Sequence, residues 1–219
     1  MVFARWADKR CSALLCLSTL CGGEARDSAP TGRQGPSERK VVSSMGLPGQ
    51  APVRTKRLVL REVRSSDPPV LERMLRDPLM RRYLGGPVSD ETIAGRLTGA
   101  SQGRLMVARC SGEIVGWCHL GRYRTGDLEL SYVFLPEWWG RGYAREACAA
   151  AIGLAFELFR DDPRLVAVTQ EANARSARLL EALGMVRVDA FEEFGARQVM
   201  YAIDRPARRP GGPPRRRAG

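Results

Sequence analysis

Alternating apolar and polar positions, rich in branched side chains, predict a series of short strands. The predicted strands cover residues 55–63, 104–110, 113–123, 127–135, 164–171, 185–191 and 197–203. Ser111-Gly112 is expected to join two of them as a hairpin, and the last two strands flank the acidic pair Glu192-Glu193. The pattern therefore predicts a sheet of about six or seven strands.

Between these strands, apolar residues recur at helical spacing. Asp67-Pro68-Pro69 opens a first helix, Asp77-Pro78 interrupts it, and a second short helix ends at Gly85-Gly86-Pro87. Further helices are predicted over 90–99, 142–159 and 174–183. The order of elements predicts a mixed sheet flanked by helices, an α/β (α+β) fold.

The length of 219 residues suits one domain with tails better than two full domains. No apolar run approaches the roughly 20 residues needed to cross a bilayer, so we do not expect a membrane protein. The net charge is +11. Residues 1–50 carry seven basic and four acidic residues, and 205–219 carry six arginines and no acid, which leaves 22 basic and 20 acidic residues for 51–204. Binding to nucleic acid would therefore depend on a tail rather than on the folded domain.

The two ends are predicted to be disordered because they hold few large apolar residues. Residues 205–219, RPARRPGGPPRRRAG, are either a solvated terminus or an electrostatic contact for RNA, the ribosome or acidic lipid. Residues 1–50 form a disordered or misassigned extension. The first 21 residues loosely resemble a secretory signal, but the true start could instead be Met45.

Six cysteines and one histidine, His119, show no spacing typical of a metal site, so we predict no metal. Cys110 and Cys118 fall in strand-like segments, and Cys148 falls on a helix face. We expect these three to be buried free thiols of a protein in a reducing cytosol.

The segment VFLPEWWGRGYAREA (133–147) places a glycine-rich turn between a strand and a long helix. Gly140 and Gly142 let main-chain N–H groups converge at the positive end of the helix, which favours an anion such as phosphate. The alternative is a tight turn without a ligand. In NARSARLLEALGM (173–185), Asn173 is either only a helix cap or, with Ser176, faces a ligand that extends from the first turn.

These two motifs, in this order and in a chain whose body begins TKRLVLREV, resemble the GNAT acyltransferases. The likeness is strongest to the Rim-type branch, which includes ribosomal-protein N-terminal acetyltransferases. It covers about residues 54–204. It implies a three-layer GNAT-like domain over 51–204, with acetyl-CoA as co-substrate and an amine as acceptor.

The resemblance also implies a role for individual residues. The main chain at Val133 and Leu135, with Phe134 between them, would contact the pantetheine arm where two strands splay apart. Asn173 and Ser176 would flank the arm on its other side. The pyrophosphate would be held by Gly140, Arg141, Gly142, Tyr143, Ala144 and Arg145.

Glu129 falls where the family often places a carboxylate base, which acts directly or through water; the alternative is an outward-facing strand carboxylate. Trp139 replaces the Gln or Arg that usually opens the pyrophosphate motif. The Tyr that many relatives use to protonate the departing thiolate falls at Leu180. The general acid is therefore unassigned, with Ser176 or water as candidates.

Tyr83 and Tyr132 are candidate acceptor-binding residues, although each could simply pack. His119 and the Trp138-Trp139 pair are expected to pack. The acidic residues of the last hairpin either attract a cationic acceptor or form a solvated loop. They are Asp189, Glu192 and Glu193.

Three functions follow as hypotheses. The first is an N-acetyltransferase that transfers acetyl directly from acetyl-CoA to a protein N-terminus or a small-molecule amine. The second is a non-catalytic CoA-binding or regulatory module, and the third is an RNA- or ribosome-associated protein that uses its arginine-rich tail. For the enzyme we expect a cytoplasmic monomer or homodimer that needs no metal and does not bind a membrane.

Overall fold

The computed structural model describes residues 51–86, 88–98 and 103–207. The leader-like segment, the extension 1–50 and the tail from residue 208 on lie outside these residues. The described strands are β1 (Val53–Arg54), β2 (Leu58–Glu62), β3 (Arg104–Ala108), β4 (Ile114–Arg122), β5 (Leu128–Phe134), β6 (Arg164–Gln170), β7 (Val186–Glu193) and β8 (Ala196–Asp204). The helices are α2 (Pro68–Arg76), α3 (Pro78–Arg81), α4 (Asp90–Thr98), α5 (Tyr143–Leu158) and α6 (Ala174–Ala182), with a 3₁₀ turn, η2 (Pro136–Trp138).

The strands form one mixed sheet in the order β1-β2-β3-β4-β5-β6-β8-β7. Only β5 and β6 pair in parallel, and every other neighbouring pair is antiparallel. Within the described residues the sheet therefore has eight strands rather than six or seven. The additional strand is β1, whose two residues are too few to show an alternating pattern in the sequence.

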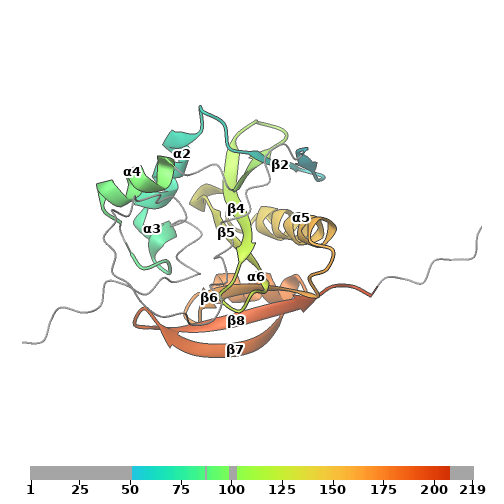
Figure 1. Cartoon of the computed structure of the whole chain (residues 1–219). Helices are drawn as coiled ribbons and strands as arrows, with labels where there is room; N and C mark the ends of the chain where they lie inside the picture. The colour runs from blue at the N-terminus through green and yellow to red at the C-terminus, as the bar shows by residue number, and fades with distance from the viewer. Residues whose placement is uncertain (1–50, 87, 99–102, 208–219) are drawn as a thin grey trace, which may run out of the picture.

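Helices cover both faces of the sheet and give three layers (Figure 1). On one face, α5 packs against β2, β4 and β5, and α6 packs against β6. Small side chains of α5 allow this close approach: Ala147, Cys148, Ala151 and Ala155 are all buried in the main core. On the other face, Leu71, Met74 and Met80 of α2 and α3 pack with Leu105 and Trp117 of the sheet.

Local sequence signals explain where several helices begin. Asp77 ends α2 and caps α3, since its carboxylate accepts hydrogen bonds from the N–H groups of Leu79 and Met80. Asn173 caps α6, as expected from the sequence.

The three cysteines of the described residues differ in burial. Cys118 and Cys148 are buried, but Cys110 is exposed, so the prediction that all three are buried was wrong for Cys110. Cys110 lies beyond the end of β3, in the turn that leads to β4.

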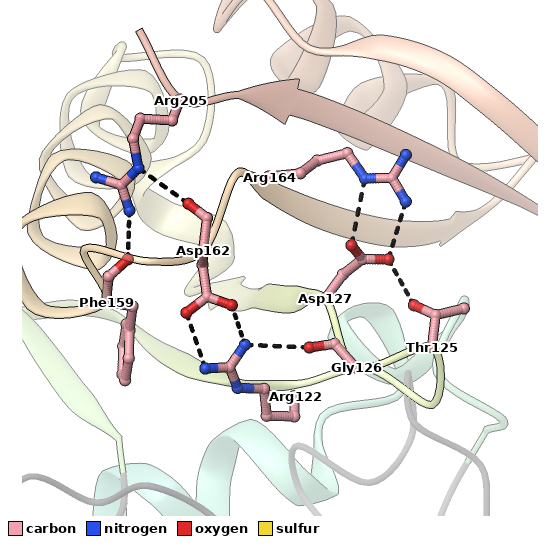
Figure 2. Close-up of polar contacts among 8 residues, drawn as sticks. All are labelled: Arg122, Thr125, Gly126, Asp127, Phe159, Asp162, Arg164 and Arg205. Carbon is pink, nitrogen blue, oxygen red and sulfur yellow. Dashed lines mark hydrogen bonds and ion pairs between the residues drawn. The ribbon is translucent and has the colours of Figure 1, made fainter. Parts of the chain in front are cut away.

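The end of the sheet remote from the glycine turn is tied together by arginines (Figure 2). Arg122 forms a bidentate ion pair with Asp162, which links β4 to the loop after α5. Arg205, which the sequence places in the tail, donates to the carbonyls of Phe156 and Phe159 at the end of α5 and to that of Asp162. Residue 205 therefore belongs to the packed body.

Candidate active site

β5 and β6 run side by side only at their beginnings. Leu128 pairs with Leu165 and Glu129 with Val166, and the ladder then stops. Beyond this point β5 stays paired with β4 as far as Phe134, while β6 stays paired with β8 as far as Gln170. The two strands thus diverge, and the main chain of β5 loses its neighbour on that side. This is the gap that the family resemblance implies.

The register decides which main-chain groups face the gap. The Leu135 N–H donates to the Val115 carbonyl of β4 at 2.9 Å. The Val133 carbonyl also lies on the β4 side, since a methyl group at Gly116 would come within 2.3 Å of it. Because main-chain direction alternates along a strand, the groups of Tyr132 and Phe134 face the gap. The structure therefore directs Val133 and Leu135 to β4, in contrast to the sequence expectation.

The glycine turn lies at the mouth of the gap. Gly140 and Gly142 have φ of +74° and +76°, a left-handed conformation that strains any residue with a side chain. Gly142 is also the N-cap of α5. Because glycine offers no capping side chain, the N–H groups of the first turn of α5 stay available to an anion. Arg141 and Arg145 are exposed beside this turn.

Arg57, just before β2, stabilises the glycine turn, and the sequence did not indicate this role. Its guanidinium donates to the Arg141 carbonyl at 2.9 Å and pairs with Glu146 of α5 at 2.6 Å. It also stacks over the ring of Tyr143, 4.3 Å from the centroid. No local motif could have indicated this role, since Arg57 is remote in sequence from all three partners.

Trp139 lines the cavity beside the glycine turn. Its indole N–H donates to the Phe134 carbonyl at 2.8 Å, which fixes the turn to the end of β5. The Arg175 guanidinium of α6 lies over its ring, 3.8 Å from the centroid. Trp138 packs edge-on against Tyr143. The packing expected for the two tryptophans is therefore present, and Trp139 also connects β5 to α6 through Arg175.

The first turn of α6 forms the opposite wall. The Asn173 side chain accepts a hydrogen bond from the Ser176 N–H at 3.2 Å. The Ser176 hydroxyl is 2.7 Å from the hydroxyl of Tyr132, which reaches across from β5. Desolvation raises the pKa of Tyr132 above its usual range, so this phenol keeps its proton at neutral pH. Leu180 is apolar and fully buried in the core, so this position offers no general acid.

A cavity of about 460 Å³ connects these features. It extends from the glycine turn, past β5 and α6, to α3. The sequence-predicted residues that line it are Tyr83, Tyr132, Val133, Phe134, Gly140, Gly142, Ala144, Asn173 and Ser176. Those outside its lining are Glu129, Leu135, Arg141, Tyr143 and Arg145. The sequence predicted that the early helices shape the acceptor side and named Tyr83 there, but it named no residue of α3, because the side chains of α3 carry no recognisable motif.

Glu129 lies behind the cavity, on the same face of β5 as Ser131 and Val133, which line it. Glu129 is 4% exposed, and burial raises the pKa of its carboxyl from 4.5 to about 7. Opposite Glu129 is Gly121 of β4, and the His119 ring leans over that glycine. The imidazole stacks on Trp117, and desolvation lowers its pKa to about 4, so it is neutral at pH 7.

The buried thiols are not poised as nucleophiles. Burial raises the pKa of Cys118 to about 12 and that of Cys148 well above its usual value. The described residues contain no cluster of histidine, cysteine and acidic side chains able to hold a metal ion. Within the same residues, every helix is too short or too polar to cross a membrane.

Comparison with known proteins decides the family. The model of the acetyltransferase (GNAT) domain matches residues 57–186, more than half of the chain. The protein is a GNAT acetyltransferase. Among the curated relatives, this GNAT enzyme is 27% identical over 150 residues to the uncharacterized N-acetyltransferase YnaD of Bacillus subtilis, which covers 64% of this chain and 86% of YnaD.

Solved structures agree with the GNAT fold. A GNAT-family acetyltransferase from Bacillus anthracis superimposes with a TM-score of 0.63 at 22% identity, over 70% of this chain and 98% of that one. Spermidine N-acetyltransferase from Vibrio cholerae, solved with CoA and spermine, gives 0.58 at 18% identity, over 68% and 96%. A putative ribosomal-protein-serine acetyltransferase from Vibrio cholerae gives 0.56 at 19% identity, over 71% and 98%.

Proposed function

We propose that this GNAT enzyme transfers the acetyl group of acetyl-CoA directly to a primary amine, and that it does so in the cytoplasm without a metal. The observation that supports this most is the single cavity that joins the glycine turn to the gap between β5 and β6. An anion cradle and a strand edge that has separated from its neighbour are the two features that a diphosphate with an amide-rich arm requires.

In this proposal the N–H groups at the start of α5 bind the diphosphate, beside Gly140 and Gly142. The main chain of Tyr132 and the N–H of Phe134 bind the amide-rich arm, since the Phe134 carbonyl already accepts the Trp139 indole N–H. A gap-facing N–H of β5 then lies where it can donate to the thioester oxygen as negative charge develops there. Asn173 and Ser176 border the arm from α6.

The reaction needs a neutral amine to attack the thioester carbon, after which the carbon–sulfur bond breaks. Deprotonation at pH 7 costs about 1.4 kcal/mol for an α-amine and about 4.6 kcal/mol for a lysine. A carboxyl with a pKa of about 7 is nearly matched to an α-amine. We propose that Glu129 takes the proton through a water molecule, since it lies just behind the cavity lining. The acceptor is then an α-amine or another amine of low pKa.

The leaving thiolate requires little help. A thiol has a pKa near 8.5, so water can protonate the departing sulfur at neutral pH. We propose that the Ser176 hydroxyl donates a hydrogen bond to this sulfur and that Tyr132 orients Ser176 through their 2.7 Å contact. Membership of the ribosomal-protein branch, and acceptors such as protein N-termini, remain part of this proposal.

Acetyl-CoA binding and thiol release test the proposal together. Calorimetry should detect acetyl-CoA binding, and an amine and peptide panel should release free CoA. An alanine at position 142 disfavours the left-handed φ of +76° by about 1–2 kcal/mol. Because the bound turn must hold that conformation, Gly142→Ala should weaken acetyl-CoA binding about tenfold. Gly153→Ala is the matched control, since Gly153 lies in exposed helix with open space around it. Equal affinities in both variants, or no binding heat, would refute the cradle.

A further inference from the structure

One wall of the cavity is formed by α3 and the turn after it. Its lining residues there are Leu79, Met80, Arg82, Tyr83 and Leu84. We call these five residues the α3 wall. Within the described residues, Arg82 is the only charged side chain that this wall contributes, and the rest of the wall is apolar apart from the Tyr83 hydroxyl.

The turn that carries Arg82 is firmly held. Arg81 is 1% exposed, and its guanidinium donates to the carbonyls of Gly86 at 2.8 Å and Leu84 at 2.5 Å. The N–H groups of the same two residues donate back to the Arg81 carbonyl. Arg82 itself lies over the Tyr83 ring, 5.3 Å from the centroid. The cation is therefore presented to the cavity from a braced turn rather than from a loose loop.

The described residues that line the cavity include three guanidiniums, those of Arg82, Arg175 and Arg178, and no carboxylate. Arg175 already stacks on Trp139 beside the glycine turn. Arg82 is the guanidinium that the α3 wall contributes. Arg82 is exposed, so solvent reaches it, but a second ammonium on the acceptor would still meet like charge there, and no carboxylate of the cavity lining would pair with it.

Acidic side chains that could have served a cationic acceptor are engaged elsewhere. Asp77 caps α3, and Glu137 pairs with Arg73. In the last hairpin, Glu193 pairs with Arg124, and Glu192 lies 3.6 Å from Arg197. Neither these four side chains nor that of Asp189, the third acid of the last hairpin, lines the cavity. The sequence hypothesis that the last hairpin attracts a cationic acceptor therefore has no support from the position of its carboxylates.

We infer that the acceptor carries a carboxylate, which Arg82 binds, a short apolar body, and one amine that faces Ser131 and Val133. This inference rests on the proposed function and names its substrate class. A guanidinium binds a carboxylate through two parallel hydrogen bonds, which orients the amine as well as adding affinity. A polyamine lacks that group and would bind poorly.

Two matched acceptor pairs test the inference and separate its two sources, a free amino acid and an acidic N-terminus. The first pair is L-phenylalanine and L-phenylalaninamide, for which kcat/KM is compared per neutral amine because the carboxylate raises the pKa of the neighbouring amine. The second is the peptide amides Ala-Asp-Ala and Ala-Asn-Ala, and spermidine is the polycationic comparison. We expect kcat/KM to favour the carboxylate member of one pair by about 10- to 100-fold, the range of a hydrogen bond to a charged group.

Arg82→Gln should abolish that preference while leaving the affinity for acetyl-CoA unchanged, and Arg82→Lys should keep part of it. Arg160→Gln, at an exposed arginine outside the cavity lining, should retain the full preference. Melting temperatures of all variants exclude unfolding as the cause of a loss. Acetylation of spermidine or of the uncharged members at an equal or higher kcat/KM would overturn the inference and leave the proposed function standing. Acetyl-CoA binding without transfer to any amine would overturn both.

Discussion

Glu129→Gln is the most informative single substitution, because it tests the buried carboxyl by stability as well as by activity. The native carboxyl has a pKa of about 7, against an ordinary value of 4.5, and desolvation is the cause. Within the described residues its carboxylate forms no hydrogen bond or ion pair that would offset this cost. A difference of this size corresponds to about 3 kcal/mol between the two protonation states.

The sign of the pH dependence follows from which state holds the proton. Below about pH 4.5 the carboxyl is protonated in both the native and the unfolded chain, and it contributes no difference. Between pH 4.5 and 7 the unfolded chain releases the proton while the native protein keeps it. Wild-type stability should therefore fall across this window, by about 3 kcal/mol relative to Glu129→Gln, and stay lower above it.

Urea unfolding of wild type and Glu129→Gln at pH 5, 6, 7 and 8 measures this difference directly. Glu113→Gln is the control, since Glu113 is exposed in the hairpin turn between β3 and β4. Stability curves for Glu129→Gln that run parallel to wild type from pH 5 to 8 would refute the desolvation argument.

The same variant tests the role of Glu129 as base. We expect kcat/KM to fall by about 10²- to 10⁴-fold. The rise of activity through pH 7 should disappear, so that only the titration of the acceptor amine remains. Acetyl-CoA affinity should be unchanged. Full activity in Glu129→Gln would remove this carboxyl from the mechanism, whatever its effect on stability.

Three further substitutions probe the framework of the site. Tyr132→Phe keeps the ring but removes the hydroxyl that contacts Ser176. Steady-state kinetics should show a several-fold loss in kcat with little change in the KM for acetyl-CoA. A change in KM alone would indicate that Tyr132 has a binding role only. Arg57→Gln removes the brace of the glycine turn and should weaken acetyl-CoA binding by roughly tenfold in calorimetry, about 1.4 kcal/mol; unaltered affinity would show that the turn holds its shape alone. Arg205→Ala leaves the carbonyls of Phe156 and Phe159 at the end of α5 without their donor. It should lower the free energy of unfolding by about 1–3 kcal/mol. Stability equal to that of the control variant Arg160→Ala, at an exposed site, would contradict this.

The sequence alone was sufficient for every described α-helix and strand except the two-residue strand β1, and for the glycine turn. Seven strands were predictable because their alternation reflects burial on a sheet face, and α5 because its small residues recur at helical spacing. Gly140 and Gly142 and the Asn173 cap are local signals, since each depends on the conformation of a few neighbouring residues. Such features depend on short segments alone, so they can be predicted without the contacts that the remaining chain makes.

Tertiary structure decided what depends on contacts remote in sequence. The brace from Arg57, the contact between Tyr132 and Ser176, and the α3 wall all bring together residues from separate elements. The gap-facing role of Tyr132 and Phe134 follows from the register of β5 against β4, because a shift of one residue reverses every main-chain direction along a strand. The pKa of Glu129 likewise arises from burial by the whole fold, which no pattern around residue 129 records.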